Sequence, residues 1–349
     1  MRVLAMMSGG VDSSVAAALL RDDGHDVVGV TLKLWGGDSD SGCCSVSDVD
    51  DARRVADHLG LDHHTFNFGD AFADHVVGPY VADHAAGRTP NPCIECNRHI
   101  KFAAVDERAR LLGFDAVATG HHARIVTHPD GTRRIARGAD GAKDQSYVLH
   151  MLDQEHLART LLPVGVLTKA VVREKAAALG LRTADKPDSQ DVCFITKARG
   201  RGSFLGDQLM LTPARVVDRT GAKVGRVDAV ELVTLGQRRG LGLAGGGPPR
   251  YVVDVDRKAA VVTVGARADL AVAEQPVTAF TWAGPPVEGE VLVQASAHGR
   301  PEPATVVADP YDLSTVTVRW ASPQRRVAAG QSVVAYEGDE VVGGGTSAG

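Results

Sequence analysis

A stretch of glycine and serine near the start of the chain has the residue types of an anion-binding loop. It reads Met7-Ser8-Gly9-Gly10-Val11-Asp12-Ser13-Ser14. Glycines let backbone N–H groups approach an anion closely, and serine hydroxyls add further donors. The stretch lacks the lysine of a Walker A loop, in which Gly-Lys-Ser/Thr follows a longer spacing. It suits a pyrophosphate that leaves, with Asp12 placed to help hold Mg²⁺.

Three of the five cysteines form a second candidate group. Cys93 and Cys96 make a C-x-x-C pair, and Cys193 lies about a hundred residues further on. Such a pair is compatible with half of a zinc site, a redox pair or part of an iron–sulfur ligand set. Adjacent thiolates such as Cys43 and Cys44 rarely ligate one tetrahedral metal together, so burial as small apolar side chains is their default interpretation.

Alternating strand and helix patterns surround these groups over residues 1 to about 125, which predicts an α/β doubly wound parallel sheet. The expected strands are Val3–Met7, Val27–Leu34, Thr65–Phe68 and Ala116–Thr119. The expected helices are Ser13–Asp23, Asp48–Leu59, Ala71–Ala86, Phe102–Leu112 and, later in the chain, Lys169–Leu179. The glycine-serine stretch therefore joins the first strand to the first helix, whose positive N-terminal end faces the same anion.

Two prolines predict a non-helical loop from Gly87 to Asn97, around the C-x-x-C pair. A helix expected to start near Asn97 would follow Cys96 directly, and its N-terminal field would lower the pKa of that thiol. Further on, Asp144–Leu152 is expected to be helical and Pro129-Asp130-Gly131 to form a hairpin turn.

Composition limits the function classes. The chain has 349 residues and a formal net charge of −5, so more than one domain is expected and the whole chain is not a basic nucleic-acid binder. RNA binding would need local basic patches, for which the candidates are Arg133, Arg134 and Arg137, then Lys197, Arg199 and Arg201, then Arg238 and Arg239, then Arg325 and Arg326. Neither a membrane span nor a signal peptide is predicted, and we expect a cytoplasmic protein.

The sequence pattern changes near residue 207, where short strands separated by turns replace the alternating pattern. We expect an N-terminal α/β catalytic domain over 1–206, a small central β-rich domain over 207–273 and a C-terminal β-barrel domain over 274–349. The glycine-rich end, Gly343 to Gly349, predicts a frayed tail.

The stretch Ser8–Ser14 resembles the loop of the PP-loop ATP pyrophosphatases, which have an adenine nucleotide α-hydrolase-like fold. Five further motifs occur in order: Thr89-Pro90-Asn91-Pro92-Cys93-x-x-Cys96-Asn97, Ala118-Thr119-Gly120-His121, Lys143-Asp144-Gln145-Ser146-Tyr147, Asp188-Ser189-x-x-x-Cys193-Phe194-Ile195 and Thr234-Leu235-Gly236-Gln237-Arg238-Arg239-Gly240-Leu241-Gly242. Together they are similar to the motifs of the tRNA-specific 2-thiouridylase (MnmA) family, and the resemblance runs from the first strand to Gly345.

The resemblance implies an ATP- and Mg²⁺-dependent 2-thiolation of the wobble uridine (U34) in tRNAs for Lys, Glu and Gln. ATP would adenylate the C2 carbonyl oxygen, which turns a poor leaving group into a good one. Cys193 would carry a persulfide delivered by a cysteine desulfurase or a sulfur-relay protein. Cys96 would then attack the persulfide and free its sulfur, leaving a Cys96–Cys193 disulfide to be reduced. Both thiols are expected in an electropositive, partly exposed setting.

The resemblance also implies two sets of binding residues. Those expected to bind ATP are Met6, Met7, Ser8, Gly9, Gly10, Val11, Asp12, Ser13, Leu32 and Gly120. Those expected to contact tRNA are Asn91, Pro92, Cys93, His121, Lys143, Asp144, Gln145 and Gln331.

One departure from the family pattern keeps a second mechanism open. Some members carry Asp where this chain has Cys93, so Cys93, Cys96 and Cys193 could together bind three irons of a [4Fe–4S] cluster, with exogenous sulfide on the fourth. Two rival functions remain, another PP-loop enzyme such as an amidating synthetase or a 4-thiouridine synthase, and a non-catalytic ATP-dependent RNA-binding module. Binding alone needs no paired thiols, which favours the thiolase.

Overall fold

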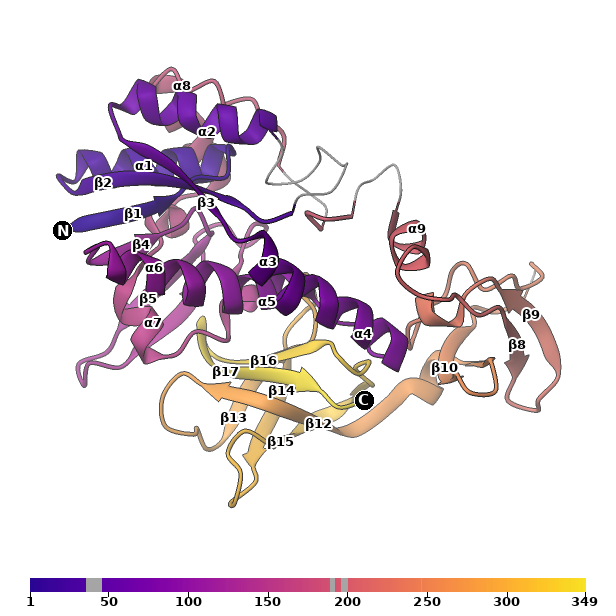
Figure 1. Ribbon diagram of the computed structural model, residues 1–349. Coiled ribbons are helices and arrows are strands. Elements are labelled where there is room, and N and C mark those ends of the chain that lie inside the picture. Colours follow the sequence, from indigo (N-terminus) through magenta and orange to yellow (C-terminus); the bar gives the residue numbers. More distant parts are fainter. Residues whose placement is uncertain (36–45, 189–191, 196–199, 246) are drawn as a thin grey trace.

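The computed structural model describes residues 1–35, 46–188, 192–195, 200–245 and 247–349 (Figure 1). Cys43, Cys44, Lys197 and Arg199, to which the sequence drew attention, lie outside the described residues. In the described part of the chain, no helix has the length and apolar character that crossing a membrane requires.

A five-stranded parallel sheet forms the N-terminal part, as the sequence predicts. Its strand order is β3 (His63–Asn67), β2 (Asp26–Lys33), β1 (Arg2–Met6), β4 (Ala116–Ala118) and β7 (Thr160–Leu161). Successive residues of β1 point to opposite faces, so Val3 and Ala5 enter one apolar cluster while Leu4 and Met6 enter the other. Burial on both faces is the reason that the inner strands β1, β2 and β4 are apolar almost throughout, whereas the edge strand β3 is mostly polar.

Helices cover both faces of this sheet. One face is covered by α1 (Val11–Asp22), α2 (Val46–Leu59) and α8 (Lys169–Ala178). The other carries α3 (Gly69–Phe72), η1 (Ala73–Val77), α4 (Gly78–Ala86), α5 (Pro92–Glu95), η2 (Cys96–Ala104) and α6 (Val105–Leu111). Shorter helices are η3 (Ser146–Leu149), α7 (Gln154–Arg159), η4 (Pro163–Val166) and α9 (Gly200–Gly206). The expected helix over Asp144–Leu152 is thus only the single 3₁₀ turn η3.

The segment around the C-x-x-C pair is helical, which corrects the prediction of a loop up to Asn97. Helix α5 begins at Pro92, and the Asn91 side chain accepts a hydrogen bond from the Cys93 N–H at 3.1 Å. Asparagine is a favoured N-cap and proline a favoured first helical residue, so these residue types start a helix here. The helix continues through η2 and α6, which places Cys96 inside it rather than before it.

A small four-stranded sheet follows, with the order β10 (Tyr251–Asp256), β11 (Val261–Gly265), β8 (Ala214–Asp218) and β9 (Lys223–Val227). Two short helices, η5 (Val230–Leu232) and η6 (Arg267–Leu270), flank it. Its own apolar cluster includes Val216, Val252 and Val262, all fully buried. The domain boundaries at residues 206 and 273 remain predictions.

The last sheet closes into a six-stranded barrel, as the sequence predicts. Its order is β12 (Ala271–Trp282), β15 (Val316–Arg325), β14 (Glu302–Ala308), β13 (Glu290–Gln294), β16 (Ser332–Glu337) and β17 (Glu340–Ser347), and β17 pairs back onto β12. The hairpin β5 (Ala123–Thr127) and β6 (Arg133–Arg137) of the N-terminal part extends this sheet, because Ala136 pairs with Glu340. The barrel therefore docks on the α/β part through strand pairing (Figure 1).

The glycine-rich end is strand rather than the predicted frayed tail. Gly343, Gly344 and Gly345 are buried in β17, where a side chain would not fit. A Cβ on Gly343 would lie 2.3 Å from the Phe280 ring, and one on Gly344 would lie 2.6 Å from His150 Nδ1. The glycines are therefore explained by close packing against neighbouring side chains.

A buried ion pair ties helix α6 to helix α7, and it allows a stability test. The Asp106 side chain is 4% exposed and accepts hydrogen bonds from Arg110 Nε at 2.8 Å and Arg159 Nε at 2.9 Å. Asp106→Ala leaves Arg159 without its buried partner and should cost about 3 kcal/mol in the free energy of unfolding. The control Glu274→Ala removes an exposed pair with Arg319 and should cost less than about 0.5 kcal/mol in urea denaturation. Equal losses in the two variants would contradict this account.

Candidate active site

The glycine-serine stretch forms a tight turn between β1 and α1. The Ser8 N–H donates to Ser13 Oγ at 3.1 Å, and the two hydroxyls lie 3.2 Å apart. Gly9 has φ +71°, and a Cβ there would lie 2.3 Å from the Asp48 carbonyl oxygen, so only glycine fits. Helix α1 is twelve residues long, and Gly10 at its N-cap makes no side-chain cap. Its first N–H groups thus remain available to an anion.

Gly120 approaches the same turn from the end of β4. A Cβ on Gly120 would lie 2.5 Å from the Ser13 nitrogen and 2.7 Å from the Asp12 carbonyl carbon. Met6 ends β1, and Leu32 lies near the end of the neighbouring strand β2. The expected ATP residues therefore gather at the carboxyl ends of three adjacent strands, the usual ligand position in an open parallel sheet.

Asp12 is held by two cationic or potentially cationic side chains. Lys169 Nζ lies 2.7 Å from each carboxylate oxygen, and His122 Nε2 lies 2.9 Å from Oδ1. Burial raises the pKa of the Asp12 carboxyl, but the hydrogen bonds from His122 and Lys169 outweigh it, and the net pKa lies below its ordinary value. Asp12 is therefore ionised near neutral pH.

Lys169 also reaches the segment that leads to Cys193. Its Nζ lies 2.8 Å from Asp188 Oδ1, so a single ammonium group joins two carboxylates. Asp188 accepts two further hydrogen bonds, one from Lys143 at 2.8 Å and one from Arg173 at 3.0 Å. Burial raises the pKa of Asp188, but the hydrogen bonds from Lys143 and Lys169 overcome it and lower the pKa to about 2. We call Asp12, Lys169, Asp188, Lys143 and Arg173 the Lys169 network.

A second lysine braces the turn from the other side. Lys186 Nζ donates to the Gly9 carbonyl at 3.0 Å, to Asp48 at 2.6 Å and to Asp51 at 2.7 Å. The Lys169 and Lys186 roles were missed from the sequence. The sequence does contain a signal for Lys169. This lysine directly follows the N-cap Thr168, and a cation in the first turn of a helix is unfavourable because it opposes the helix dipole.

Two of the three cysteines share one apolar cluster. Cys96 is 7% exposed, and Cys193 is half-buried against the same cluster. Phe194 anchors the Cys193 segment there, with ring centroids 5.2 Å from Phe204 and 5.4 Å from Tyr80. Burial of Cys96 contradicts the expectation that both thiols are partly exposed. Cys93, in contrast, is exposed.

The described residues contain no group of three or more His, Cys, Asp or Glu side chains arranged to hold a metal ion. Exposure of Cys93 and burial of Cys96 set these two thiols in different surroundings, although they are three residues apart. The three-cysteine ligand set of an iron–sulfur cluster is therefore not assembled in this conformation.

Most residues expected to contact tRNA make internal contacts. Asn91 caps helix α5 and Pro92 is buried. His121 Nδ1 lies 2.7 Å from the Thr119 hydroxyl, and burial, then the charge of Lys101, lower its pKa well below the ordinary value. The internal partners of the others are Asp188 for Lys143, Arg137 and Ser146 for Asp144, the His122 N–H for Gln145 and the Thr89 carbonyl for Gln331.

Several arginines of the candidate basic patches also make contacts within the protein. Arg134 pairs with Glu337, and Arg325 and Arg326 donate to the carbonyls of Leu235 and Val253. Arg238 and Arg239 are exposed on the glycine-rich loop of the central part. Of the expected patches that the structure describes in full, this pair is the one in which every arginine is exposed.

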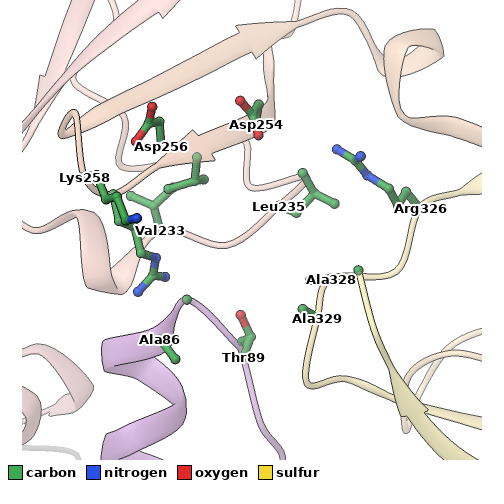
Figure 2. A pocket seen from close by; sticks show the side chains of 14 residues that line it. Ala86, Thr89, Val233, Leu235, Asp254, Asp256, Lys258, Arg326, Ala328 and Ala329 are labelled. Carbon is green, nitrogen blue, oxygen red and sulfur yellow. The ribbon is translucent and has the colours of Figure 1, made fainter. Parts of the chain in front are cut away.

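A cavity of about 550 Å³ lies where the α/β part, the central sheet and the barrel meet. Figure 2 shows Thr89 and Ala329 side by side on one wall and Asp254 and Asp256 on the opposite wall. None of its lining residues, all within the described chain, belongs to the set expected to bind ATP. The cavity is therefore separate from the turn at Ser8–Ser13.

Three family models match consecutive parts of the chain. They are described as a tRNA methyl transferase HUP domain over residues 1–197, a tRNA methyl transferase PRC-barrel domain over 202–266 and an aminomethyltransferase beta-barrel domain over 274–346. Relatives named tRNA-specific 2-thiouridylase MnmA match almost end to end. The protein from Chloroflexus aurantiacus is 47% identical over 98% of this chain and 97% of its own, and that from Beutenbergia cavernae is 48% identical over 100% and 95%.

Among solved structures, a 4-thiouridine synthetase–RNA complex with bound ATP matches with a TM-score of 0.39 and 18% identity, over 59% of this chain and 49% of its own. The U34-tRNA thiolase NcsA from Methanococcus maripaludis, with its [4Fe-4S] cluster, matches with a TM-score of 0.37 and 18% identity, over 60% and 66%.

The Lys169 network predicts a pH-dependent stability. The pKa of Asp188 is about 2 in the folded chain against 3.8 ordinarily, so its stabilisation is present above about pH 4 and is lost as pH falls towards 2. Asp188→Asn should lower the free energy of unfolding at pH 6 by on the order of 1 kcal/mol, since the side chain is 22% exposed and partly screened. The difference from wild type, measured by denaturation at several pH values, should shrink below pH 4. Asp185→Asn, at an exposed position, is the control, and a difference that grew on acidification would refute the assignment.

Proposed function

The chain belongs to the tRNA-specific 2-thiouridylase family, and on that premise we propose that it thiolates C2 of the wobble uridine, U34, in tRNAs for Lys, Glu and Gln. The protein is a tRNA-uridine 2-sulfurtransferase that binds ATP and tRNA. One observation carries the finer proposal: Lys169 joins Asp12, at the turn expected to hold ATP, to Asp188, which shortly precedes Cys193. Activation and sulfur delivery therefore share one charge network.

The first step makes a bond between the C2 oxygen of uridine and the α-phosphorus of ATP, and it breaks the α–β phosphoanhydride bond. Pyrophosphate departs into the turn at Ser8–Ser13, where backbone N–H groups and the N-terminus of α1 stabilise its charge. Lys169 adds a positive charge beside Asp12. Mg²⁺, when bound, neutralises phosphate charge, and the ionised Asp12 carboxylate is the group that fits it.

The second stage supplies sulfur from a Cys193 persulfide. The Cys96 thiolate attacks Cys193 Sγ, the inner sulfur of the persulfide. A Cys96–Cys193 disulfide forms as the sulfur–sulfur bond of the persulfide breaks, and hydrosulfide leaves. Hydrosulfide adds to C2 and AMP departs, which gives 2-thiouridine. An external dithiol then supplies the two electrons that reduce the disulfide. Packing of Cys96 and Cys193 against one apolar cluster supports this pairing.

The alternative with a [4Fe–4S] cluster requires Cys93 as a ligand beside Cys96 and Cys193. Among the residues that the structure describes, these three cysteines are not grouped as a metal ligand set, which favours the persulfide route. Because tRNA is the substrate, we propose that the enzyme works in the cytoplasm, with a cysteine desulfurase or a relay protein as its sulfur donor.

Cysteine variants separate these two routes. Cys96→Ser and Cys193→Ser should each lower 2-thiouridine formation below detection, because each removes a sulfur atom that the transfer requires. Cys93→Ser should retain activity within about threefold of wild type, because the persulfide route does not use that thiol. The measurement is nucleoside mass spectrometry of tRNA incubated with ATP, Mg²⁺ and a persulfide donor. Loss of activity in Cys93→Ser, with iron bound after anaerobic reconstitution of the wild type, would favour the cluster instead.

Lys169 has a matched control on the same helix. Lys169→Met should lower tRNA-dependent pyrophosphate release by about 100-fold, because a preorganised charge beside the leaving group is lost. Lys175→Met makes the same change at an exposed position of α8 and should have little effect. Pyrophosphate release at a near-normal rate in Lys169→Met would show that the lysine is not part of the activation step.

A further inference from the structure

The side chain of His122 lies beside Asp12, and the proposed reaction does not use it. It is 4% exposed, and its Nε2 lies 2.9 Å from Asp12 Oδ1. An ionised carboxylate can only accept hydrogen bonds, so Nε2 carries the hydrogen and donates it. The other ring nitrogen, Nδ1, is buried and has no hydrogen-bond partner within the described part of the chain. The ring is thus oriented by its contact with Asp12.

The backbone of His122 is held by Gln145. The His122 N–H donates to Gln145 Oε1 at 2.8 Å, and the Gln145 N–H donates to the His122 carbonyl at 2.9 Å. Gly138 packs against the same carbonyl, since a Cβ there would lie 2.5 Å from the oxygen. These contacts leave His122 little freedom to move independently of Gln145.

Gln145 ends the Lys143–Gln145 segment, which is expected to contact tRNA. Asp144 fixes this segment from within, because its Oδ1 accepts hydrogen bonds from two backbone N–H groups, both at 3.0 Å. A continuous set of hydrogen bonds therefore runs from the expected tRNA segment through His122 to Asp12, at the turn expected to hold ATP. We call this connection the His122 route.

The Lys169 network makes a second connection from the same segment, which begins with the hydrogen bond from Lys143 to Asp188. This connection is looser, because the Lys143 side chain is 38% exposed and a lysine has a long, flexible stem. The His122 route instead uses a buried ring and hydrogen bonds to its own backbone. It is therefore the stiffer of the two connections.

We propose that His122 is a positioning residue that couples tRNA binding to ATP binding. Contacts of tRNA with the Lys143–Gln145 segment fix that segment, and His122 passes the constraint to the Asp12 carboxylate. Since Asp12 is then already ordered, the second ligand binds at a smaller entropic cost, and each ligand tightens the binding of the other. The inference rests on the proposed function for the place of the tRNA contact, but its test measures binding and does not depend on thiolation.

The experiment uses two substitutions that differ by one methylene group. His122→Gln places an amide N–H where the imidazole Nε2–H lies, so it can still donate to Asp12. His122→Asn is too short to reach that position, and His122→Ser is a second short replacement that should behave in the same way. The control His156→Asn makes the same change at another His–Asp contact, on helix α7, where Nδ1 lies 2.7 Å from Asp153.

Titration calorimetry measures the Kd of α,β-methylene ATP with Mg²⁺, first without tRNA and then with saturating unmodified tRNA for Lys. The methylene bridge prevents cleavage, so the measurement reports binding alone. The ratio of the two Kd values gives the coupling between the ligands. Thermal unfolding checks that each variant is folded.

In the wild type, tRNA should tighten binding of the analogue by about fivefold or more. In His122→Asn this ratio should fall below about twofold, while the Kd without tRNA stays within about twofold of wild type, because the backbone of the turn is unchanged. His122→Gln and His156→Asn should both keep the wild-type ratio.

A ratio near one in the wild type would overturn the proposal, as would equal ratios in folded His122→Asn and His122→Gln. A Kd that rises equally with and without tRNA in His122→Asn would also overturn it and make His122 a contact of ATP itself. Failure of the wild type to form 2-thiouridine would refute the proposed function, and the binding ratios would still decide on the role of His122.

Discussion

The site depends on one ammonium group, Lys169 Nζ, which lies within 2.8 Å of both Asp12 and Asp188. Two carboxylates this close to one another would repel, and each would be driven towards its neutral form. The shared lysine keeps both ionised and ties the first turn of helix α1 to the residues that lead to Cys193. The anion-binding turn and the sulfur-carrying segment are thereby coupled through charge, although more than 170 residues separate them in sequence.

The remaining architecture holds the reacting groups at fixed positions. The parallel sheet gathers the turn, Leu32 and Gly120 at one edge, and the aromatic cluster around Phe194 holds the Cys193 segment against the sheet. The barrel packs behind the two segments expected to meet RNA, through strand pairing with β6 and through Gln331 and Ser332. The sheet, the aromatic cluster and the barrel thus form a rigid frame around the site that receives the tRNA.

Local pattern in the sequence predicts the parallel sheet, its first strand–turn–helix unit and the barrel, because alternation of strand and helix and the spacing of turn residues are short-range signals. The local pattern gives a wrong prediction where contacts with residues distant in the sequence determine the structure. Gly343 to Gly345 form a strand because Phe280 and His150 leave no room for side chains, and Cys96 is buried by a cluster drawn from many elements. Asn91 followed by Pro92 is a local signal for the start of a helix. Proline considered without its neighbour instead predicts a loop. Lys169 was missed because only the fold brings it to Asp12, 157 residues away in the sequence, and to Asp188 at the same time.

In the proposed reaction, the C2 oxygen of the target uridine becomes bonded to phosphorus before sulfur arrives. Transfer of an oxygen isotope tests it directly. A tRNA carrying ¹⁸O at C2 of U34 is thiolated to completion, and the AMP and pyrophosphate are analysed by mass spectrometry. The account predicts one ¹⁸O atom in AMP and none in pyrophosphate. Label released to water, or AMP without label alongside full thiolation, would contradict it.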